Sequence, residues 1–409
     1  MEVKPGYRQT EVGVIPEEWG VKPLGEIGGV RMCKRVLKHQ TREHGDVPFY
    51  KIGTFGDVPD AFIGQSLFDE LKRKYSFPQK GDVLISAAGT IGRTVIYDGA
   101  PAYFQDSNIV WIENDESKAT NAYLWHRYQI TKWSVSHGGT VARLYNDSLR
   151  TKIFIPLPPL PEQRAIAEAL SDVDGLLGGL DRLIAKKRDL KQAAMQQLLT
   201  GQTRLPSFHG EWEVKLLGSI ADILKGCALS KSLVTATGTR RCILYGELFT
   251  TYGRVISDVF GQTNSSEGCS SIQGDVLMPG STTTTGIDLA TASALLIDDV
   301  ALGGDIIIIR RKSNAYDSVF LANYLTQVRR HEIAELTQGI TIHHLYGKDL
   351  KTLTLQLPPL PEQTAIAEVL TEMAEELRAL EQRREKTRAL KQAMMQELLT
   401  GRIRLVGKN

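Results

Sequence analysis

The sequence predicts an α+β protein in which two mixed α/β globular domains are separated by two long antiparallel helices that form a coiled coil, arranged as a pseudo-two-fold internal repeat. The repeat is the first observation behind this prediction, because residues 155–205 align without a gap to residues 355–405 and 28 of the 51 positions are identical. The second observation is periodicity: each repeated segment carries apolar residues at helical spacing, whereas the longer segments before them carry short β-branched and aromatic runs.

The repeat divides the chain into alternating globular and helical segments. We expect these boundaries: a first globular domain at 1–155, a first helical region at 156–204, a second globular domain at 205–355 and a second helical region at 356–409. Outside the helices the halves match only at short anchors, such as the segments around Trp19 and Trp212 and the GDVL motif at 81–84 and 274–277. The frame is therefore duplicated while the domain interiors differ, which suggests two sites of one kind with different specificities.

Each helical region begins with a proline-rich turn and ends at a glycine. Pro161 and Pro361 suit the first helical turn, where a missing N–H leaves no intrahelical bond unmade. Each region ends in LLTG, which places Gly201 and Gly401 as left-handed residues beyond the last turn. About 38 helical residues would give a rod roughly 57 Å long.

The apolar residues of the two helices follow a 4-3-4-3 spacing, which is typical of a coiled-coil seam. Long helices gain most of their stability from packing an apolar face, so the simplest arrangement packs the two helices against each other. The predicted seam consists of Ile166, Leu170, Val173, Leu177, Leu180, Ile184, Ile366, Leu370, Met373, Leu377 and Leu380. An ordinary amphipathic pair inside a compact core is the alternative.

The globular segments have the composition of short strands punctuated by glycine and followed by helices. Strands are expected at 83–86, 94–97, 108–112, 275–278, 294–297 and 305–310. Helices are expected over 119–131 and 318–335. Each domain then continues into a loop, GGTVARLY at 138–145 or GITIHHLY at 339–346, before the proline-rich turn.

Composition sets broad limits on function. The net charge of +2 gives no overall argument for nucleic acid, and no apolar run is long enough to cross a membrane. The N-terminus has no apolar core of a secretory signal. The four cysteines form no CxxC pair, so neither a zinc site nor a disulfide framework is expected, and a cytoplasmic protein with reduced thiols fits the sequence.

The motifs together resemble one known family. GDVLISAAGTIGR at 81–93, DSNIVWI at 106–112 and the run from GGTVARLY into PLPPLPEQ at 138–163 are similar to a target recognition domain running into its conserved helix. The chain resembles, over essentially its whole length, the specificity subunit of type I restriction-modification systems. The second domain departs from this pattern, because GDVLMPGSTTTTGIDLA at 274–290 has a threonine run in place of the AGTIGR loop.

The resemblance implies a function, partners and cofactors. Each recognition domain would read one half of a bipartite double-stranded DNA target, and the helix pair would set the half-site spacing and dock methyltransferase subunits. Restriction subunits would join that complex. This chain itself would bind no cofactor or metal, since S-adenosylmethionine, Mg²⁺ and ATP belong to the partner subunits.

Base reading needs side chains that present donors and acceptors to base edges or phosphates. The candidate DNA-binding residues are Thr90, Arg93, Arg143, Tyr145, Thr283, Thr284, His343, His344 and Tyr346. The two adjacent histidines could also be considered as metal ligands, but no third ligand has supporting spacing.

Two other classes of function stay open at this stage. Pro59-Asp60 followed by Glu70 and Lys72 matches a short nuclease pattern that would hold Mg²⁺, although the second half has no counterpart. A coiled-coil scaffold whose domains bind protein is the other alternative. We find neither the tetrapeptide nor the cofactor loop that an amino-methyltransferase would need.

Overall fold

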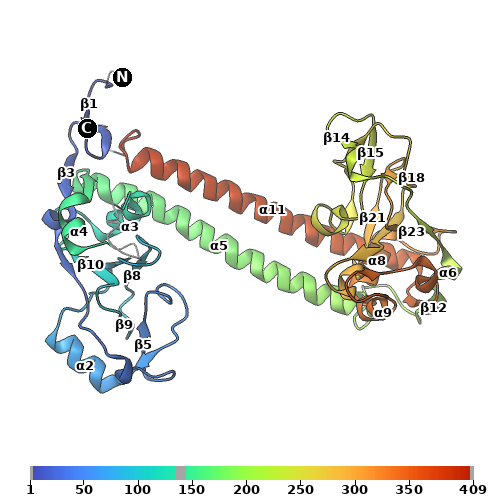
Figure 1. Cartoon of the computed structure of the whole chain (residues 1–409), viewed down its shortest axis with the longest axis horizontal. Coiled ribbons are helices and arrows are strands. Elements are labelled where there is room, and N and C mark those ends of the chain that lie inside the picture. Colours follow the sequence, from blue (N-terminus) through green and yellow to red (C-terminus); the bar gives the residue numbers. More distant parts are fainter. Residues whose placement is uncertain (1–2, 134–143, 406–409) are drawn as a thin grey trace. The chain divides into compact units, whose positions relative to one another are not determined.

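The computed structural model describes residues 3–133 and 144–405 (Figure 1). The chain divides into two compact units, of which the first comprises Met1–Asp181 with Arg383–Asn409 and the second comprises Arg182–Gln382. Each unit contains one globular domain, the first part of the helix that follows it and the last part of the other long helix. Within the described ranges, no helix combines the length and apolar composition needed to span a membrane.

The long helices are α5 (Leu160–Leu198) and α11 (Leu360–Leu398), each of 39 residues and about 58 Å long at 1.5 Å per residue. They run antiparallel in both units. In the first unit Asp174 pairs with Lys391 at 2.7 Å and Asp181 with Arg384 at 3.4 Å. In the second unit Lys187 pairs with Glu376 at 2.7 Å, and the next residue of α5, Arg188, pairs with Glu381.

Most of the predicted seam residues are buried. In the first unit Ile166 and Leu170 join a core that includes Met395 and Leu398 from the end of α11. The second unit repeats this arrangement with residues from the start of α11 and the end of α5. Buried seam residues are Ile166, Leu170, Leu180, Ile184, Ile366, Leu370 and Leu377, and half-buried ones are Val173, Leu177, Met373 and Leu380.

The first domain is built on a four-stranded antiparallel sheet of order β4-β10-β7-β8 and a three-stranded sheet of order β6-β5-β9. Its strands are β1 (Tyr7–Thr10), β2 (Gly13–Pro16), β3 (Gly20–Pro23), β4 (Gly29–Arg31), β5 (Val47–Tyr50), β6 (Phe62–Ile63), β7 (Val83–Ser86), β8 (Thr94–Ile96), β9 (Tyr103–Phe104), β10 (Ile109–Glu113) and β11 (Phe154–Leu157). Its helices are α1 (Leu24–Ile27), α2 (Gln65–Lys74), α3 (Asn121–Ile130) and α4 (Asn146–Lys152), with a 3-10 turn η1 (Lys38–Gln40).

The second domain has two five-stranded sheets, of order β13-β23-β19-β21-β16 and β14-β17-β15-β22-β18. Its strands are β12 (Glu213–Leu216), β13 (Ala221–Lys225), β14 (Val234–Thr235), β15 (Arg240–Ile243), β16 (Val255–Ile256), β17 (Gln262–Thr263), β18 (Cys269–Ser270), β19 (Asp275–Pro279), β20 (Ser281–Thr282), β21 (Ser293–Leu295), β22 (Ala301–Leu302), β23 (Ile306–Arg311), β24 (His343–His344) and β25 (Thr354–Leu357). The helical elements are α6 (Leu217–Ile220), α7 (Glu247–Thr250), α8 (Ser318–Gln327), α9 (Arg330–Glu335) and α10 (Gly347–Leu350), with 3-10 turns η2 (Lys231–Leu233) and η3 (Gly286–Ala290).

The strand order shows a duplication that the sequence barely retains. The order β4-β10-β7-β8 in the first domain matches β13-β23-β19-β21 in the second, in the same succession along the chain. The parallel pair β5–β9, with β6 antiparallel beside β5, likewise matches the parallel pair β15–β22, with β17 antiparallel beside β15. The two domains therefore share one topology with different side chains.

Six predicted strands are confirmed as β7, β8, β10, β19, β21 and β23, and the helix predicted over 119–131 is confirmed as α3. The helix predicted over 318–335 is instead two helices, α8 and α9. Arg329 leaves the helical conformation (φ −99°, ψ 9°), and the amides of both Val328 and Arg329 bond to the carbonyl of Tyr324. The Arg329 guanidinium lies 5.5 Å from the Tyr324 ring and pairs with Glu332, which fixes the break.

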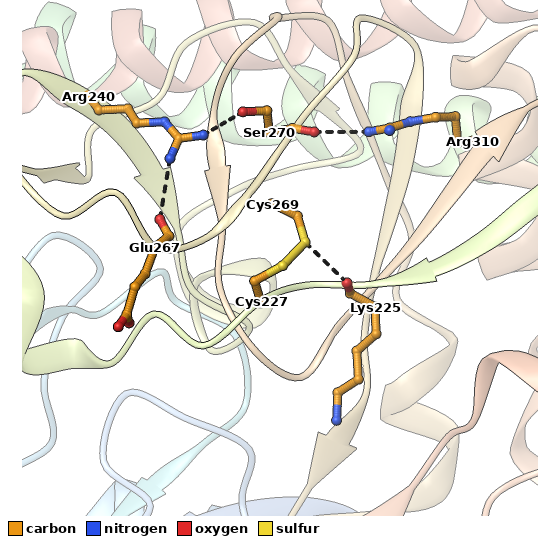
Figure 2. The surroundings of a disulfide bond; sticks show 7 residues. All are labelled: Lys225, Cys227, Arg240, Glu267, Cys269, Ser270 and Arg310. Atoms are coloured by element: carbon orange, nitrogen blue, oxygen red, sulfur yellow. Dashed lines mark hydrogen bonds between the residues drawn. A yellow bond between two sulfur atoms is a disulfide. The ribbon is translucent and has the colours of Figure 1, made fainter.

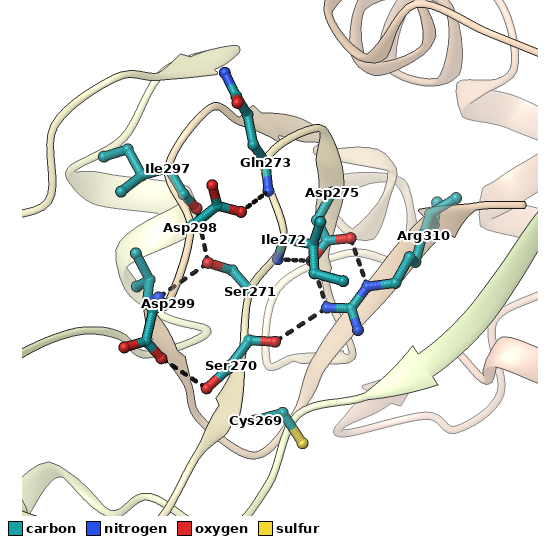
Figure 3. A network of polar contacts seen from close by, with 12 residues as sticks. Cys269, Ser270, Ser271, Ile272, Gln273, Asp275, Ile297, Asp298, Asp299 and Arg310 are labelled. Carbon is teal, nitrogen blue, oxygen red and sulfur yellow. Dashed lines mark hydrogen bonds and ion pairs between the residues drawn. The ribbon is translucent and has the colours of Figure 1, made fainter. Parts of the chain in front are cut away.

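The repeated GDVL motif begins a buried strand in each domain. Gly81 and Gly274 adopt φ of +95° and +93°, which favours glycine. The buried Asp82 and Asp275 each accept a bond from the amide three residues earlier, at 2.7 and 2.8 Å. In the second domain Asp275 also takes a bidentate pair from Arg310, which donates in addition to the carbonyl of Ser270 (Figure 3). The motif is therefore a structural turn.

The PEQ motif anchors the start of each long helix to its own domain. Gln163 accepts a bond from the amide of Thr120, the N-cap of α3, and donates to the carbonyl of Pro158. Gln363 makes the same two bonds to Asp317, the N-cap of α8, and Pro358.

An ion pair with a buried carboxylate joins the segment after each long helix to the start of the other long helix. In the first unit Arg404 donates to both carboxylate oxygens of Glu162 at 2.7 and 2.9 Å, and the indole of Trp19 donates to the same carboxylate at 3.0 Å. In the second unit Arg204 makes the equivalent bidentate pair with Glu362. We call each arrangement a helix clamp.

The predicted left-handed glycines are confirmed, because Gly201 and Gly401 both have φ of +71°. A Cβ on Gly401 would lie 2.4 Å from Pro16, so this position excludes a side chain for two reasons.

Candidate nucleic-acid interface

One backbone connection gathers the predicted DNA-binding residues of each domain. The amide of Leu144 donates to the carbonyl of Ala87 at 2.8 Å, and the amide of Leu345 donates to that of Gly280 at 2.9 Å. In both domains this bond brings the residues before α4 or α10 beside the loop that follows the GDVL strand. Candidates that are about 50 to 60 residues apart in sequence therefore meet at one edge of each domain.

In the first domain the loop at 87–93 is a closed turn. Ser86 Oγ donates to the carbonyl of Thr90 at 2.5 Å and accepts from the amide of Arg93 at 2.8 Å. Gly89 and Gly92 adopt φ of +65° and +81°, and a Cβ on Gly92 would lie 2.2 Å from the indole of Trp133. The glycines of this loop therefore set its shape, and the shape exposes Thr90.

The other candidates of the first domain differ in their freedom. Arg93 is exposed, but its guanidinium donates to the carbonyl of Phe55 at 2.6 Å, which fixes its direction. Tyr145 is 51% exposed at the N-terminus of α4. Arg143 lies outside the described residues.

In the second domain a short ladder assembles the site. Strand β20 pairs antiparallel with β24, so Thr282 faces His343 and Ser281 faces His344. Thr284 Oγ1 donates to Asp288 at 2.6 Å, and Thr285 bonds to the same carboxylate, so these threonines cap η3. The hydrogen bonds lower the pKa of Asp288 and keep it ionised. Thr283 is exposed beside the capped turn, which makes it freer than Thr284 for an outside ligand.

Aromatic and basic side chains surround the end of this ladder. The centroids of the stacked His344 and Tyr346 rings lie 6.2 Å apart, and Lys348 Nζ lies 5.7 Å from the centroid of the Tyr346 ring. Tyr346 is 43% exposed. These three side chains line a hollow of about 190 Å³ with Lys225 and Lys351. Cations beside an exposed aromatic ring are the groups that contact phosphates and bases. The sequence analysis missed Lys225, Lys348 and Lys351 as candidates, although Lys348 and Lys351 lie in the segment GKDLK directly after Tyr346.

In the part of the chain that the structure describes, the residues of the metal and nuclease alternatives do not come together as a site. Adjacent residues of a strand point to opposite faces, so His343 and His344 cannot share one ion. Asp60 pairs with Lys51 at 2.8 Å and Glu70 with Lys74 at 2.8 Å, while Lys72 lies over the rings of Phe68 and Phe77. Nowhere in residues 3–133 and 144–405 do three His, Cys, Asp or Glu side chains form a group that could hold a metal.

The structure corrects the expectation of four separate thiols, because Cys227 and Cys269 form a disulfide (Figure 2). Both cysteines lie beside β22: Cys269 is paired with Leu302 in the β18–β22 ladder, and Cys227 makes a bridge to Gly303. Long-range strand pairing therefore brings together two residues that no local motif connects. Cys33 and Cys242 are free and buried, and burial raises the pKa of Cys33 to about 12.

Comparison with known proteins places this geometry in a family. The family model described as "Type I restriction modification DNA specificity domain" matches residues 16–184 and again 209–388. A putative type I restriction enzyme specificity subunit of Haemophilus influenzae is 59% identical over 174 residues, which are 42% of this chain and 45% of that protein. The putative MjaX specificity subunit of Methanocaldococcus jannaschii is 25% identical over 98% of this chain and 97% of that protein.

Two solved structures share the fold. The type I restriction-modification S subunit from M. genitalium aligns with a TM-score of 0.59 and 14% identity, covering 97% of this chain and 98% of that one. A chain from a structure describing complex assembly and conformational transition of the type I system aligns with a TM-score of 0.55 and 18% identity, covering 95% and 99%.

Proposed function

Because this chain belongs to the type I restriction-modification DNA specificity family, we propose that it is the sequence-specific DNA-binding subunit of a type I complex. Each globular domain reads one half of a bipartite target. The observation that carries this proposal is the pair of loops at equivalent places on one duplicated frame, 87–93 after β7 and 280–288 after β19. The frame is the same in both domains, while the side chains that the loops present are different.

The candidate residues have separate roles in this proposal. Thr90, Tyr145, Thr283, His343 and Tyr346 present donors, acceptors or an aromatic face to bases, whereas Lys348 and Lys351 contact phosphate. Arg93 and Thr284 hold their loops in shape, because each bonds within its own domain. Arg143 and His344 complete the candidate set, the latter by supporting the Tyr346 ring.

The helix pair sets the distance between half-sites and docks methyltransferase subunits. Two recognition sites on a rigid frame gain affinity together only where both half-sites lie at the permitted spacing. Half-sites on one side of the duplex lie about 34 Å apart, and a helix of about 58 Å is long enough to bridge them.

The chain is non-catalytic in this proposal. S-adenosylmethionine, Mg²⁺ and ATP act in the methyltransferase and restriction subunits, and the complex works in the cytoplasm.

The test is selection of duplex DNA from a random library by the full chain co-purified with its methyltransferase. We expect enrichment of one split motif, and a Tyr346→Ala variant should relax only one half of it. A matched variant, Tyr75→Ala, removes a comparably exposed tyrosine outside the candidate interface and should leave the motif unchanged. A complex that binds duplexes with no sequence preference would favour the scaffold alternative.

A further inference from the structure

The second unit contains a cavity of about 590 Å³ that the DNA interface does not use. It lies among α5, α11, α8 and the segment 253–257. Its polar lining comes from Lys191, Arg254, Arg378, Glu375, Asn323 and Gln327. Three cations and one carboxylate therefore face a space large enough for a small ligand.

Within the described residues, none of the three cations of this cavity makes an ion pair with a carboxylate. Lys191 is half-buried, and across the described residues its ammonium makes neither an ion pair nor a hydrogen bond. Arg254 has one long bond, from Nη1 to the carbonyl of Ala292 at 3.4 Å, and no carboxylate pairs with it in the same ranges. Burial lowers the pKa of both groups. Arg254 lowers the pKa of Lys191 further, against an opposing effect of Glu381, which is itself paired with Arg188, and Arg330 lowers the pKa of Arg254. Lys191 and Arg254 are half-buried, and partly desolvated charge of one sign is costly unless a counter-ion is present.

At the equivalent position of the first unit, a side chain fills the space and a carboxylate neutralises the lysine. There Lys391, the repeat partner of Lys191, pairs with Asp174 at 2.7 Å. His126 fills the space beside them, with Nε2 3.2 Å from Ser171 Oγ and Nδ1 3.9 Å from Asp174.

In the second unit the alignment replaces these groups with smaller or neutral ones. Ala374 stands where the first unit has Asp174, and Thr371 stands at the position of Ser171. Asn323 takes the place of His126, because α3 and α8 begin at equivalent N-caps held by the PEQ glutamines. Loss of the carboxylate and the imidazole leaves both the space and the unbalanced charge.

From this juxtaposition we propose that the Lys191–Arg254–Arg378 cavity binds a phosphate group. One carboxylate, as in the first unit, would offset only one cation, whereas phosphate carries up to two charges and three strong acceptor oxygens. Guanidinium groups bind phosphate in a bidentate manner. The volume exceeds that of phosphate alone, so the ligand is a phosphate attached to a larger group: a small phosphorylated metabolite or a backbone phosphate of bound DNA. The phosphate site itself does not depend on the proposed function, whereas the DNA backbone as its source rests on that function.

The test uses the full chain, purified with its methyltransferase partner, and inorganic phosphate and AMP as probes. Phosphate should raise the midpoint of thermal denaturation in a saturable way, beyond the effect of sodium chloride at equal ionic strength. Lys191→Met should weaken phosphate binding at least tenfold. Lys186→Met removes an exposed lysine of the same helix outside the cavity and should leave the binding unchanged.

A second variant protects the test against misfolding of the first. Ala374→Asp supplies the carboxylate that Asp174 supplies in the first unit. It should raise the denaturation midpoint in phosphate-free buffer and abolish the response to phosphate.

The source of the phosphate is distinguished by a DNA arm. If the cavity holds a backbone phosphate, free phosphate and AMP will have no specific effect. The salt dependence of DNA binding should then fall by about one unit of slope in both Lys191→Met and Ala374→Asp. The proposal is overturned if these variants match the wild type and Lys186→Met both in the response to phosphate and in the salt slope.

Discussion

Removing one guanidinium should test the helix clamp of the first unit. Arg404 makes two hydrogen bonds to Glu162, whose side chain is fully buried and also receives the indole N–H of Trp19. An Arg404→Met variant keeps much of the aliphatic stem but leaves a buried carboxylate with only the Trp19 bond.

Breaking a buried ion pair by removal of one partner costs about 3–5 kcal/mol. Arg404 is partly exposed, so we take the lower end, about 3 kcal/mol. For a unit of this size that corresponds to a fall of roughly 6–12 °C in the denaturation midpoint.

The assay is thermal denaturation followed by circular dichroism, combined with hydrogen exchange at the start of α5. Arg402→Met is the matched control, because the exposed Arg402 lies two residues away and pairs only with the half-buried Glu397 at 3.4 Å. It should shift the midpoint by less than 2 °C. Equal midpoints for the two variants, or unchanged exchange at the start of α5 in Arg404→Met, would refute the reasoning.

Four further predictions concern pH, thiols, spacing and phosphate contacts. Burial lowers the pKa of His126 to about 4 from an unfolded value near 6.5, so the neutral imidazole stabilises the first unit above pH 6.5, and up to about 3 kcal/mol of that stability is lost as the pH falls to 4. In His126→Asn, the free energy of unfolding measured with urea should depend less on pH between 6.5 and 4. An unchanged dependence on pH would contradict the burial of a neutral His126. After reduction, alkylation should label Cys227 and Cys269 within minutes and the buried Cys33 and Cys242 only on unfolding, as read by mass spectrometry; early labelling of Cys33 would count against its burial. Four residues inserted after both Arg182 and Gln382, next to the paired Asp181 and Arg384, should lengthen each long helix by about 6 Å. The spacing between methylated half-sites should then change by one or two base pairs. Altered half-site sequences would show that the helices do more than set the distance. Lys348→Met should weaken binding to all duplexes alike and reduce the salt slope by about one, and a loss confined to one sequence would assign Lys348 to base reading instead.

The frame was predictable because its signals are local. The PLPPLPEQ turn, the apolar spacing and the LLTG glycine each act within a few residues, and the structure confirms two 39-residue helices with left-handed glycines after them. The short strands were predictable for the same reason, since runs such as 83–86 and 306–309 are buried and rich in β-branched residues.

The remaining features depend on pairing between distant residues. Thr282 meets His343 only because β20 pairs with β24, and Cys227 meets Cys269 only because both lie beside β22. The repeat alignment does contain a signal for the helix clamps, because Arg204 and Arg404 occupy identical positions after LLTG. It also contains a signal for the cavity, because Ala374 replaces Asp174. Neither could be interpreted without knowing which side chains face Lys191, Glu162 and Glu362.

The most direct test of the central claim is a map of DNA modification. The full chain is expressed with its methyltransferase in a host that lacks other modification systems, and methylated positions are located across the genome. Our account predicts a single motif of two defined half-sites separated by a fixed number of unspecified base pairs, lost when this chain is omitted. A contiguous motif, or modification that persists without this chain, would contradict it.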